Sequence, residues 1–223
     1  MNTNKTWIDQ LLNTMIATDR AGAVALTERL IQGGMPLAHV ISDILGPALL
    51  RIGVLWGKES VSLAQTFVAA KIAEDVLLRC MPEVGADAPH KSPVVIGNIE
   101  DDFHSLGRHI VATFLRAAGW EVYDLGNDVL AEEFVDKAVE VNASVVGVSA
   151  MMQTTALNIR KVRDLLDARG LQAHLKLAVG GAVFNWRPQL VAEVGADGTA
   201  ENAAGADALL LRLQSETKGK LQS

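Results

Sequence analysis

Cysteine is nearly missing from the sequence, since Cys80 is the one cysteine among 223 residues. A single thiol excludes a disulfide framework and any metal or cluster site built from several cysteines. Aromatic residues make up only 4% of the chain, and the formal net charge is −6. An acidic chain with few aromatic side chains has neither the basic surface nor the stacking platforms that nucleic-acid binding uses. We therefore expect no nucleic acid among its partners.

Long apolar runs are missing as well. We find no stretch of about 18 or more consecutive apolar residues of the kind that crosses a membrane. The N-terminal residues 1–12 lack the basic start and apolar run of a signal peptide. The apolar fraction is nevertheless 49%, which is ample for a packed core. These features predict a folded cytoplasmic protein with no membrane partner.

Residues 82–92 contain two prolines and a glycine without any periodicity, and they predict a linker between two domains. Before this linker, in residues 1–81, apolar residues recur at helical spacing in four segments joined by short turns. Pro47 should kink the third helix or mark a boundary in it, and Ser60 or Ser62 can cap the fourth. The pattern predicts an antiparallel four-helix bundle.

After the linker, residues 93–213 alternate between short apolar strands and amphipathic helices. This alternation predicts an α/β Rossmann-like (flavodoxin-like) domain with a five-stranded parallel sheet covered on both faces. Residues 214–223 are expected to form a frayed polar tail. The predicted strands are 94–98, 121–125, 144–148, 175–179 and a stub at 198–199, and the predicted helices are 106–118, 131–141, 155–169, 188–194 and 201–213.

Ligands of such sheets bind at the carboxyl ends of the strands, so the loops that follow the strands are informative. The first strand is followed by residues 100–107, where three acids, a histidine and a serine crowd into one turn. Residues 149–155 follow the third strand, and a Gly-Gly pair, residues 180–181, follows the fourth. Each loop also has a plain structural interpretation: Ser105 and Thr154 or Thr155 can cap helices, and a Gly-Gly pair can form a simple turn.

The three loops together are more specific than any one of them. Asp102-x-His104-x-x-Gly107, Ser149-x-Met151 and Gly180-Gly181 follow successive strands. This combination resembles the cobalamin-binding domain family, whose signature is DxHxxG, then SxL, then GG, and the resemblance covers residues 93–213. The helical half resembles the bundle that precedes this domain in corrinoid proteins of methyltransferase systems. That match is weaker, because it rests on the apolar pattern and on the stretch Gly46 to Glu59.

The resemblance implies a cobalamin cofactor whose cobalt takes His104 as its lower axial ligand, an imidazole being a suitable ligand for such a metal. In the family's binding mode the cofactor's own benzimidazole is displaced and inserted into the domain. Asp102 is then placed to accept the second ring N–H of the histidine, which fixes its tautomer. The implied metal ligand is His104, and the implied cofactor-binding residues are Asp102, Phe103, His104, Ser105, Gly107, Ser149, Met151, Gln153, Thr155, Gly180 and Gly181.

The sequence departs from the family pattern at two of these positions. Met151 replaces the family leucine at a similar volume, and Gln153 stands where many members carry threonine or serine. Thr155 occupies the position from which some members complete a hydrogen-bond relay to the aspartate. Trp56 ends a helix of the bundle, which the family places over the upper face of the cobalt, although core packing is the preferred interpretation of this residue. The upper histidine ligand of a related photoreceptor subgroup is missing, because the stretch at residues 64–67 reads Ala-Gln-Thr-Phe.

The leading functional hypothesis is a corrinoid methyl carrier that does no catalysis alone. Its implied partners are a substrate-specific methyltransferase, an acceptor methyltransferase and a reductive activase. The alternative is a cobalamin-dependent sensor or antirepressor that acts through a protein partner. A phosphorylation receiver is disfavoured because Ser149 and the Thr199 region stand where an aspartate and a lysine are needed. A mutase is disfavoured because the chain lacks a large substrate barrel.

Overall fold

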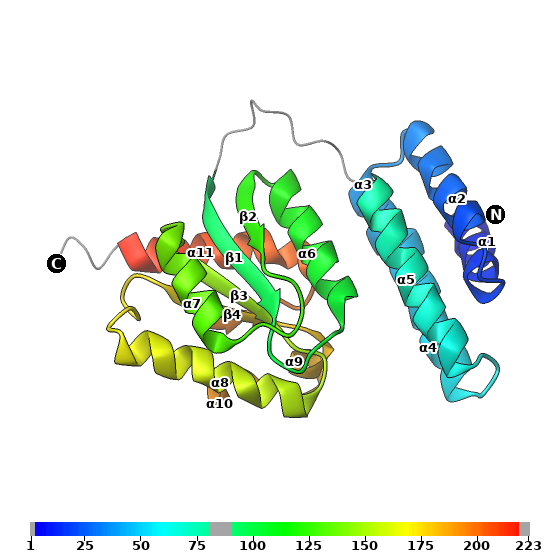
Figure 1. Cartoon of the computed structure of the whole chain (residues 1–223). Helices are drawn as coiled ribbons and strands as arrows, with labels where there is room; N and C mark the ends of the chain where they lie inside the picture. Colours follow the sequence, from blue (N-terminus) through cyan, green and yellow to red (C-terminus); the bar gives the residue numbers. More distant parts are fainter. Residues whose placement is uncertain (1–2, 81–90, 219–223) are drawn as a thin grey trace. The chain divides into compact units, whose positions relative to one another are not determined.

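The structure, a computed structural model, describes residues 3–80 and 91–218 (Figure 1). Backbone contacts divide the chain into two units, residues 1–83 and 84–223. The predicted linker, residues 82–92, lies outside the described residues except for its last two positions, which open the first strand.

The first unit is helical, as the apolar spacing predicted. Its third predicted helix is divided into a short α-turn, a π-helical turn and an α-helix that carries Pro47 in its first turn. Proline has no N–H to donate, so the helical hydrogen-bond pattern changes just before it. Of the two predicted caps, Ser62 accepts the backbone N–H of Gln65 at 3.2 Å. The elements are α1 (Thr3–Ile16), α2 (Arg20–Gln32), α3 (Leu37–His39), η1 (Val40–Leu45), α4 (Gly46–Gly57) and α5 (Leu63–Cys80).

The core of the helical unit forms where α1 packs on α2, α4 and α5, and where α2 packs on α5. One stretch, Leu37–Gly57, is long and apolar enough to cross a membrane by length and composition, which the sequence analysis did not anticipate. A helix that serves a protein core passes the same test, so one such stretch is weak evidence for a span. Its apolar residues that are buried inside the unit are Val40, Ile41, Ile44, Leu45, Ala48 and Ile52.

The second unit is a five-stranded sheet with strand order β2-β1-β3-β4-β5, and every pair of neighbouring strands is parallel. The predicted fold class is therefore confirmed. The strands are β1 (Lys91–Asn98), β2 (Trp120–Asp124), β3 (Val145–Ser149), β4 (Lys176–Gly180) and β5 (Gly198–Thr199). The helices are α6 (Ser105–Ala117), α7 (Ala131–Glu140), α8 (Gln153–Ala168), α9 (Ala182–Trp186), α10 (Leu190–Glu193), η2 (Ala203–Gly205) and α11 (Ala206–Lys218).

Successive residues of β1 point to opposite faces of the sheet, and both faces are covered by helices (Figure 1). Val94 and Ile96 pack with residues of α6 and α11 on one face. Val95 packs with residues of α7 and α8 on the other. The central residues of β1 are buried on both faces and apolar, which is why the strand was visible in the sequence as an apolar run.

The C-terminal part differs from the prediction in two ways. A short helix, α9, forms directly after the Gly-Gly pair and was not predicted. The frayed tail expected from residue 214 is wrong for its first residues, because α11 continues to Lys218. Gln214 and Thr217 are buried, and the Gln214 amide donates a hydrogen bond to the Ser92 hydroxyl. These contacts hold the last helical turns against the sheet.

The strand order turns in opposite directions on the two sides of β1 and β3, and a crevice at the carboxyl ends is typical of this switch point. The sheet register aligns these ends closely, since Asn98 of β1 pairs with Ser149 of β3, and Ser149 pairs with Gly180 of β4. The three motif loops therefore leave the sheet side by side.

Gly97 gives a test of the packing between β1 and α7. A Cβ at this position would lie 2.8 Å from Cε1 and Cζ of the buried Phe134 ring. Gly97→Ala should therefore destabilise the second unit by about 1–3 kcal/mol, as overpacking does. The measurement is denaturant unfolding followed by the NMR amide signals of β1 and β3. Combining it with Phe134→Leu should cost about 0.5–3 kcal/mol less than the sum of the single changes, because the smaller side chain removes the clash. Strict additivity would show that the ring does not constrain Gly97.

Candidate functional site

The Asp102 carboxylate is the centre of the site. It follows β1, its side chain is fully buried, and both oxygens accept several hydrogen bonds. Oδ2 accepts the backbone N–H of Met151 at 2.7 Å and the hydroxyl of Thr155 at 2.8 Å. Oδ1 accepts the Asn98 amide at 2.9 Å and the backbone N–H of His104 at 3.0 Å. These bonds tie the loop after β1 to the loop after β3.

The same contacts set the charge of this carboxyl group. Burial of Asp102 disfavours the ionised form, but the hydrogen bonds from Met151, His104, Asn98 and Thr155 favour it and together outweigh the burial. The pKa of the Asp102 carboxyl is therefore held below its ordinary value of 3.8. At neutral pH the group is a buried anion that accepts hydrogen bonds and donates none.

His104 lies against this anion. Its Nδ1 is 3.2 Å from Asp102 Oδ1, and half of its side chain is exposed. Because an ionised carboxylate only accepts, the facing Nδ1 must carry the hydrogen. In a neutral imidazole the lone pair then lies on Nε2, the ring nitrogen that is free to meet a ligand. The contact with Asp102 therefore fixes the Nδ1–H tautomer of His104 and leaves Nε2 as its basic nitrogen.

The loop after β3 contributes in a way that the sequence only partly indicated. The hydrogen bond from Thr155 to Asp102 is present, and Thr155 is therefore not the cap of α8. The backbone N–H of Met151 binds the same carboxylate, whereas its side chain is exposed. Gln153 is exposed at the first position of α8. The loop thus supplies donors to the carboxylate and leaves its longer side chains outside.

The two glycines after β4 have different surroundings. Gly181 has a φ of +115°, and a Cβ there would lie 1.9 Å from the carbonyl oxygen of Ala150. Only glycine fits this close approach of two backbones. A Cβ at Gly180 would meet nothing within 4 Å. Ser149 is half-buried at the end of the neighbouring strand, so the space above Gly180 is bordered by a hydroxyl group.

The remaining predicted residues lie around His104. Phe103 is exposed, and Ser105 is buried at the first position of α6. The cap of this helix is His104, without a side-chain hydrogen bond, so the predicted capping by Ser105 is wrong. A Cβ at Gly107 would meet nothing within 4 Å, which leaves open space beside the first turn of the helix.

Two buried residues of the site were missed by the sequence analysis. Asn98, the last residue of β1, donates to both Asp102 and the carbonyl of His104. Arg108 on α6 donates to Asn98 from the other side. A polar residue that ends an unbroken apolar strand, four positions before Asp102, was the available signal for Asn98. Nothing in the pattern of α6 distinguished Arg108 from a surface arginine.

These residues suit a metal that a macrocycle already holds. Within residues 3–80 and 91–218, no group of three or more His, Cys, Asp or Glu side chains could hold a bare metal ion. A cobalt in a corrin ring would need only one axial nitrogen from the protein, and His104 Nε2 would be the nitrogen to supply it. The open space at Gly107 and Gly180 leaves room on either side for the ring and its tail. The site therefore fits a cobalamin.

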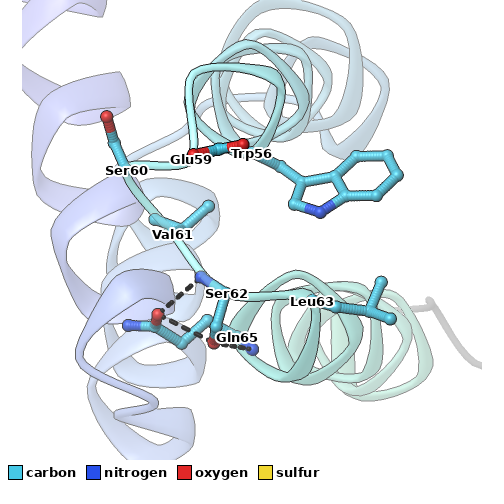
Figure 2. Close-up of a pocket in the computed structure, with 7 residues that line it drawn as sticks. All are labelled: Trp56, Glu59, Ser60, Val61, Ser62, Leu63 and Gln65. Carbon is cyan, nitrogen blue, oxygen red and sulfur yellow. Dashed lines mark hydrogen bonds between the residues drawn. The ribbon is translucent and has the colours of Figure 1, made fainter.

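A pocket of about 480 Å³ lies on the helical unit, at the turn between α4 and α5. Figure 2 shows Trp56 and Leu63 on the same side of this turn, with Gln65 held by hydrogen bonds to Ser62. Trp56 is half-exposed, so its preferred interpretation as a core residue is wrong. The pocket has a mixed apolar and polar lining with a single carboxylate, which is not a set of metal ligands; it is formed by Trp56, Glu59, Ser60, Val61, Ser62, Leu63 and Gln65.

The lowered pKa of Asp102 predicts how acid affects the cofactor-free protein. A lowered pKa in the folded state contributes stability above the ordinary value of 3.8, and this contribution disappears as the pH falls below it. The unfolding free energy of the second unit should fall more steeply with acid in the wild type than in Asp102→Asn. At neutral pH the variant should lose about 1–3 kcal/mol, because its amide leaves buried donors unsatisfied. Denaturant unfolding at several pH values, followed by NMR signals of the sheet, measures both effects.

Asp101→Asn is the matched control. Asp101 is exposed, and its backbone has a φ of +66°, which asparagine also tolerates. This variant should keep the acid dependence of the wild type. Equal pH slopes for the wild type and Asp102→Asn would contradict the role assigned to the buried carboxylate.

Comparisons with known proteins identify the family of both units. Residues 92–207 match a family described as B12 binding domain, and residues 7–80 match a second family of the same description. Dimethylamine corrinoid protein 2 of Methanosarcina mazei is 35% identical over 216 residues, which cover 95% of this chain and 100% of the relative. Dimethylamine corrinoid protein 1 of Methanosarcina acetivorans is 34% identical over 204 residues, 89% of this chain and 93% of the relative.

Two solved structures extend the comparison. The monomethylamine corrinoid protein of Methanosarcina barkeri has a TM-score of 0.81 and 28% identity, covering 94% of this chain and 99% of the other. A cobalamin-binding protein from Desulfitobacterium hafniense has a TM-score of 0.53 and 24% identity, covering 92% and 98%, and shows the shared fold alone. The predicted cobalamin cofactor is thereby confirmed. The chain belongs to the family of cobalamin-binding corrinoid proteins of methyltransferase systems.

Proposed function

We propose that the protein carries a methyl group on cobalamin between two methyltransferases, with His104 as the lower axial ligand and the benzimidazole displaced. The observation that carries the proposal is the pairing of His104 Nδ1 with the buried Asp102 carboxylate, at 3.2 Å. This contact leaves Nε2 as the nitrogen available to cobalt. The open space at Gly180 beside Ser149 supports the insertion of the displaced base and its tail.

The bound cofactor supplies a cobalt centre that accepts a methyl group and gives it up again. The residues of the chain position this centre and adjust its ligand. Asp102 keeps the proton on His104 Nδ1, orients the ring and raises the basicity of Nε2. Asp102 and His104 thus form a hydrogen-bonded pair that holds Nε2 available to the metal.

The proposed partners are a methyltransferase that delivers the methyl group and one that removes it, with a reductive activase to restore the cofactor. Two relatives are named for dimethylamine and one solved neighbour for monomethylamine. These names support methylated amines as the first methyl donors to test. No acid–base pair or nucleophile is evident at the site, among the described residues, beyond the Asp102–His104 pair. The chain alone is therefore proposed to have negligible turnover.

The ligand assignment is tested by electron paramagnetic resonance of the reconstituted protein in its Co(II) state. Nitrogen hyperfine coupling should be present and should change when histidine is labelled with ¹⁵N. His104→Ala should keep part of the cobalamin, because the corrin and tail bury more surface than the ligand does, but it should lose this coupling. Asp102→Asn should keep the ligand and lose about 10–100-fold in affinity or activity.

His174→Ala is the control for the labelling experiment, since His174 is an exposed histidine of the same unit. Its spectrum should match that of the wild type. If labelling the benzimidazole of the cofactor alters the coupling and labelling histidine does not, the proposed binding mode is wrong.

The carrier role is tested by adding candidate methyltransferases, with mono- and dimethylamine as donors, to the reduced reconstituted protein. We expect stoichiometric methylation of the cofactor, seen in its absorption spectrum, only when a cognate methyltransferase is present. Omitting the methyltransferase is the control and should leave the spectrum unchanged. A protein that no methyltransferase methylates, but whose association with a transcription regulator depends on cobalamin, would replace the carrier with a sensor.

A further inference from the structure

A buried cation lies next to the ligand loop, in the first turn of α6. The Arg108 side chain is only 5% exposed, although it carries a permanent charge. Its Nε lies 2.8 Å from a carboxylate oxygen of Asp124, an ion-pair contact that balances the charge but does not have hydrogen-bond geometry. Its Nη1 donates to the side-chain oxygens of Asn127 at 2.7 Å and of Asn98 at 3.1 Å, and its Nη2 lies 2.9 Å from Nε2 of His109. Such a residue is costly to bury unless its hydrogen bonds are used.

The contact with Asn98 determines how that amide is oriented. A guanidinium group has donors only, so the Asn98 atom that faces Arg108 must be the oxygen. The amide nitrogen then points the other way, where it donates to Asp102 Oδ1 at 2.9 Å and to the His104 carbonyl at 3.2 Å. The opposite orientation would place the amide oxygen against a buried carboxylate and the amide nitrogen against a cation. Arg108 and Asp102 together therefore exclude it.

The orientation matters because Asn98 and His104 share one acceptor. Asp102 Oδ1 receives the Asn98 amide, the His104 backbone N–H and the His104 ring. Asn98 and the backbone hold this oxygen in place, and its position selects the tautomer of the ring. A chain of direct contacts thus runs from Asp124 through Arg108, Asn98 and Asp102 to His104.

We infer that Arg108 is a positioning residue, which fixes the Asn98 amide and through it the Nδ1–H tautomer of His104. The tautomer is a property of the cofactor-free chain, whereas its consequence for cobalt ligation rests on the proposed function. In the cobalamin-bound protein, a mixture of the two tautomers would lower the fraction of molecules in which His104 presents Nε2 to the metal. Partners of this kind are typically worth about 10–100-fold in metal affinity or activity.

The test is the ¹⁵N NMR signature of the His104 ring in the cofactor-free protein, measured well above the ordinary histidine pKa of about 6.5. The wild type should hold the hydrogen on Nδ1. Arg108→Gln should lower the ratio of the Nδ1–H to the Nε2–H form about tenfold or more. Arg108→Lys should restore it in part, because lysine keeps the charge but cannot span the same acceptors. Arg116→Gln, the same change at the other end of α6, should leave the ratio unchanged.

Arg108→Gln leaves Asp124 without its cation, and a second variant therefore keeps the test valid if the first fails to fold. Asn98→Asp retains a bond to Arg108 but turns a carboxylate oxygen, instead of an amide donor, toward Asp102. It should shift the tautomer ratio in the same direction. A wild-type ratio in Asn98→Asp, or in a folded Arg108→Gln, would overturn the inference, as would a wild-type ring with its hydrogen on Nε2.

The loaded protein gives a second readout. Co(II) spectra of Arg108→Gln and Asn98→Asp should show a smaller fraction of histidine-bound cobalt than the wild type and Arg116→Gln. An unchanged tautomer with an altered spectrum would contradict the inference. Failure of His104 to bind cobalt in the wild type would instead overturn the proposed function and leave the tautomer measurement intact.

Discussion

One buried carboxylate organises the site. Asp102 is inaccessible to water and remains charged because its hydrogen bonds replace the lost hydration. These bonds come from the end of β1, from the ligand loop itself and from the loop after β3. A surface aspartate could carry the same charge, but it would leave the histidine ring free to rotate. Because the carboxylate is buried and held by hydrogen bonds, it accepts the hydrogen of the His104 ring in one fixed orientation.

The parallel sheet makes this arrangement possible. Because β1 and β3 are neighbours at the switch point, two segments distant in sequence end beside each other and share an acceptor. Arg108 adds a third segment, since it binds Asp124 at the end of β2. The ligand loop is thus held from both neighbours of β1. The backbone of Gly181 lies directly against the carbonyl group of Ala150, and this close contact restricts movement of the chain beside Gly180.

The sequence predicted the strands, their parallel arrangement and the three loops well, because strands buried on both faces are continuous apolar runs and helices are amphipathic. It predicted the Asp102–His104 pair through a family motif. It did not predict Asn98 or Arg108, because their roles depend on which side chains meet in space. The predicted cap at Thr155 failed because its hydroxyl donates to the buried Asp102 carboxylate, and the predicted cap at Ser105 failed because the helix begins one residue earlier than expected. The frayed tail was wrong because polarity alone does not show that Gln214 has a buried partner.

The sequence separation within the site also has a consequence for how the protein is made. Thr155, a donor to Asp102, follows it by 53 residues, and Met151 by 49. At a synthesis rate of about 5–20 residues per second, the ligand loop exists for roughly 3–10 s before these partners have been added to the chain. During that interval His104 is attached to a loop whose aspartate lacks two of its five donors. The finished ligand pair therefore arises only after Thr155 has been added to the chain, and we expect cofactor binding through His104 to follow that point of synthesis.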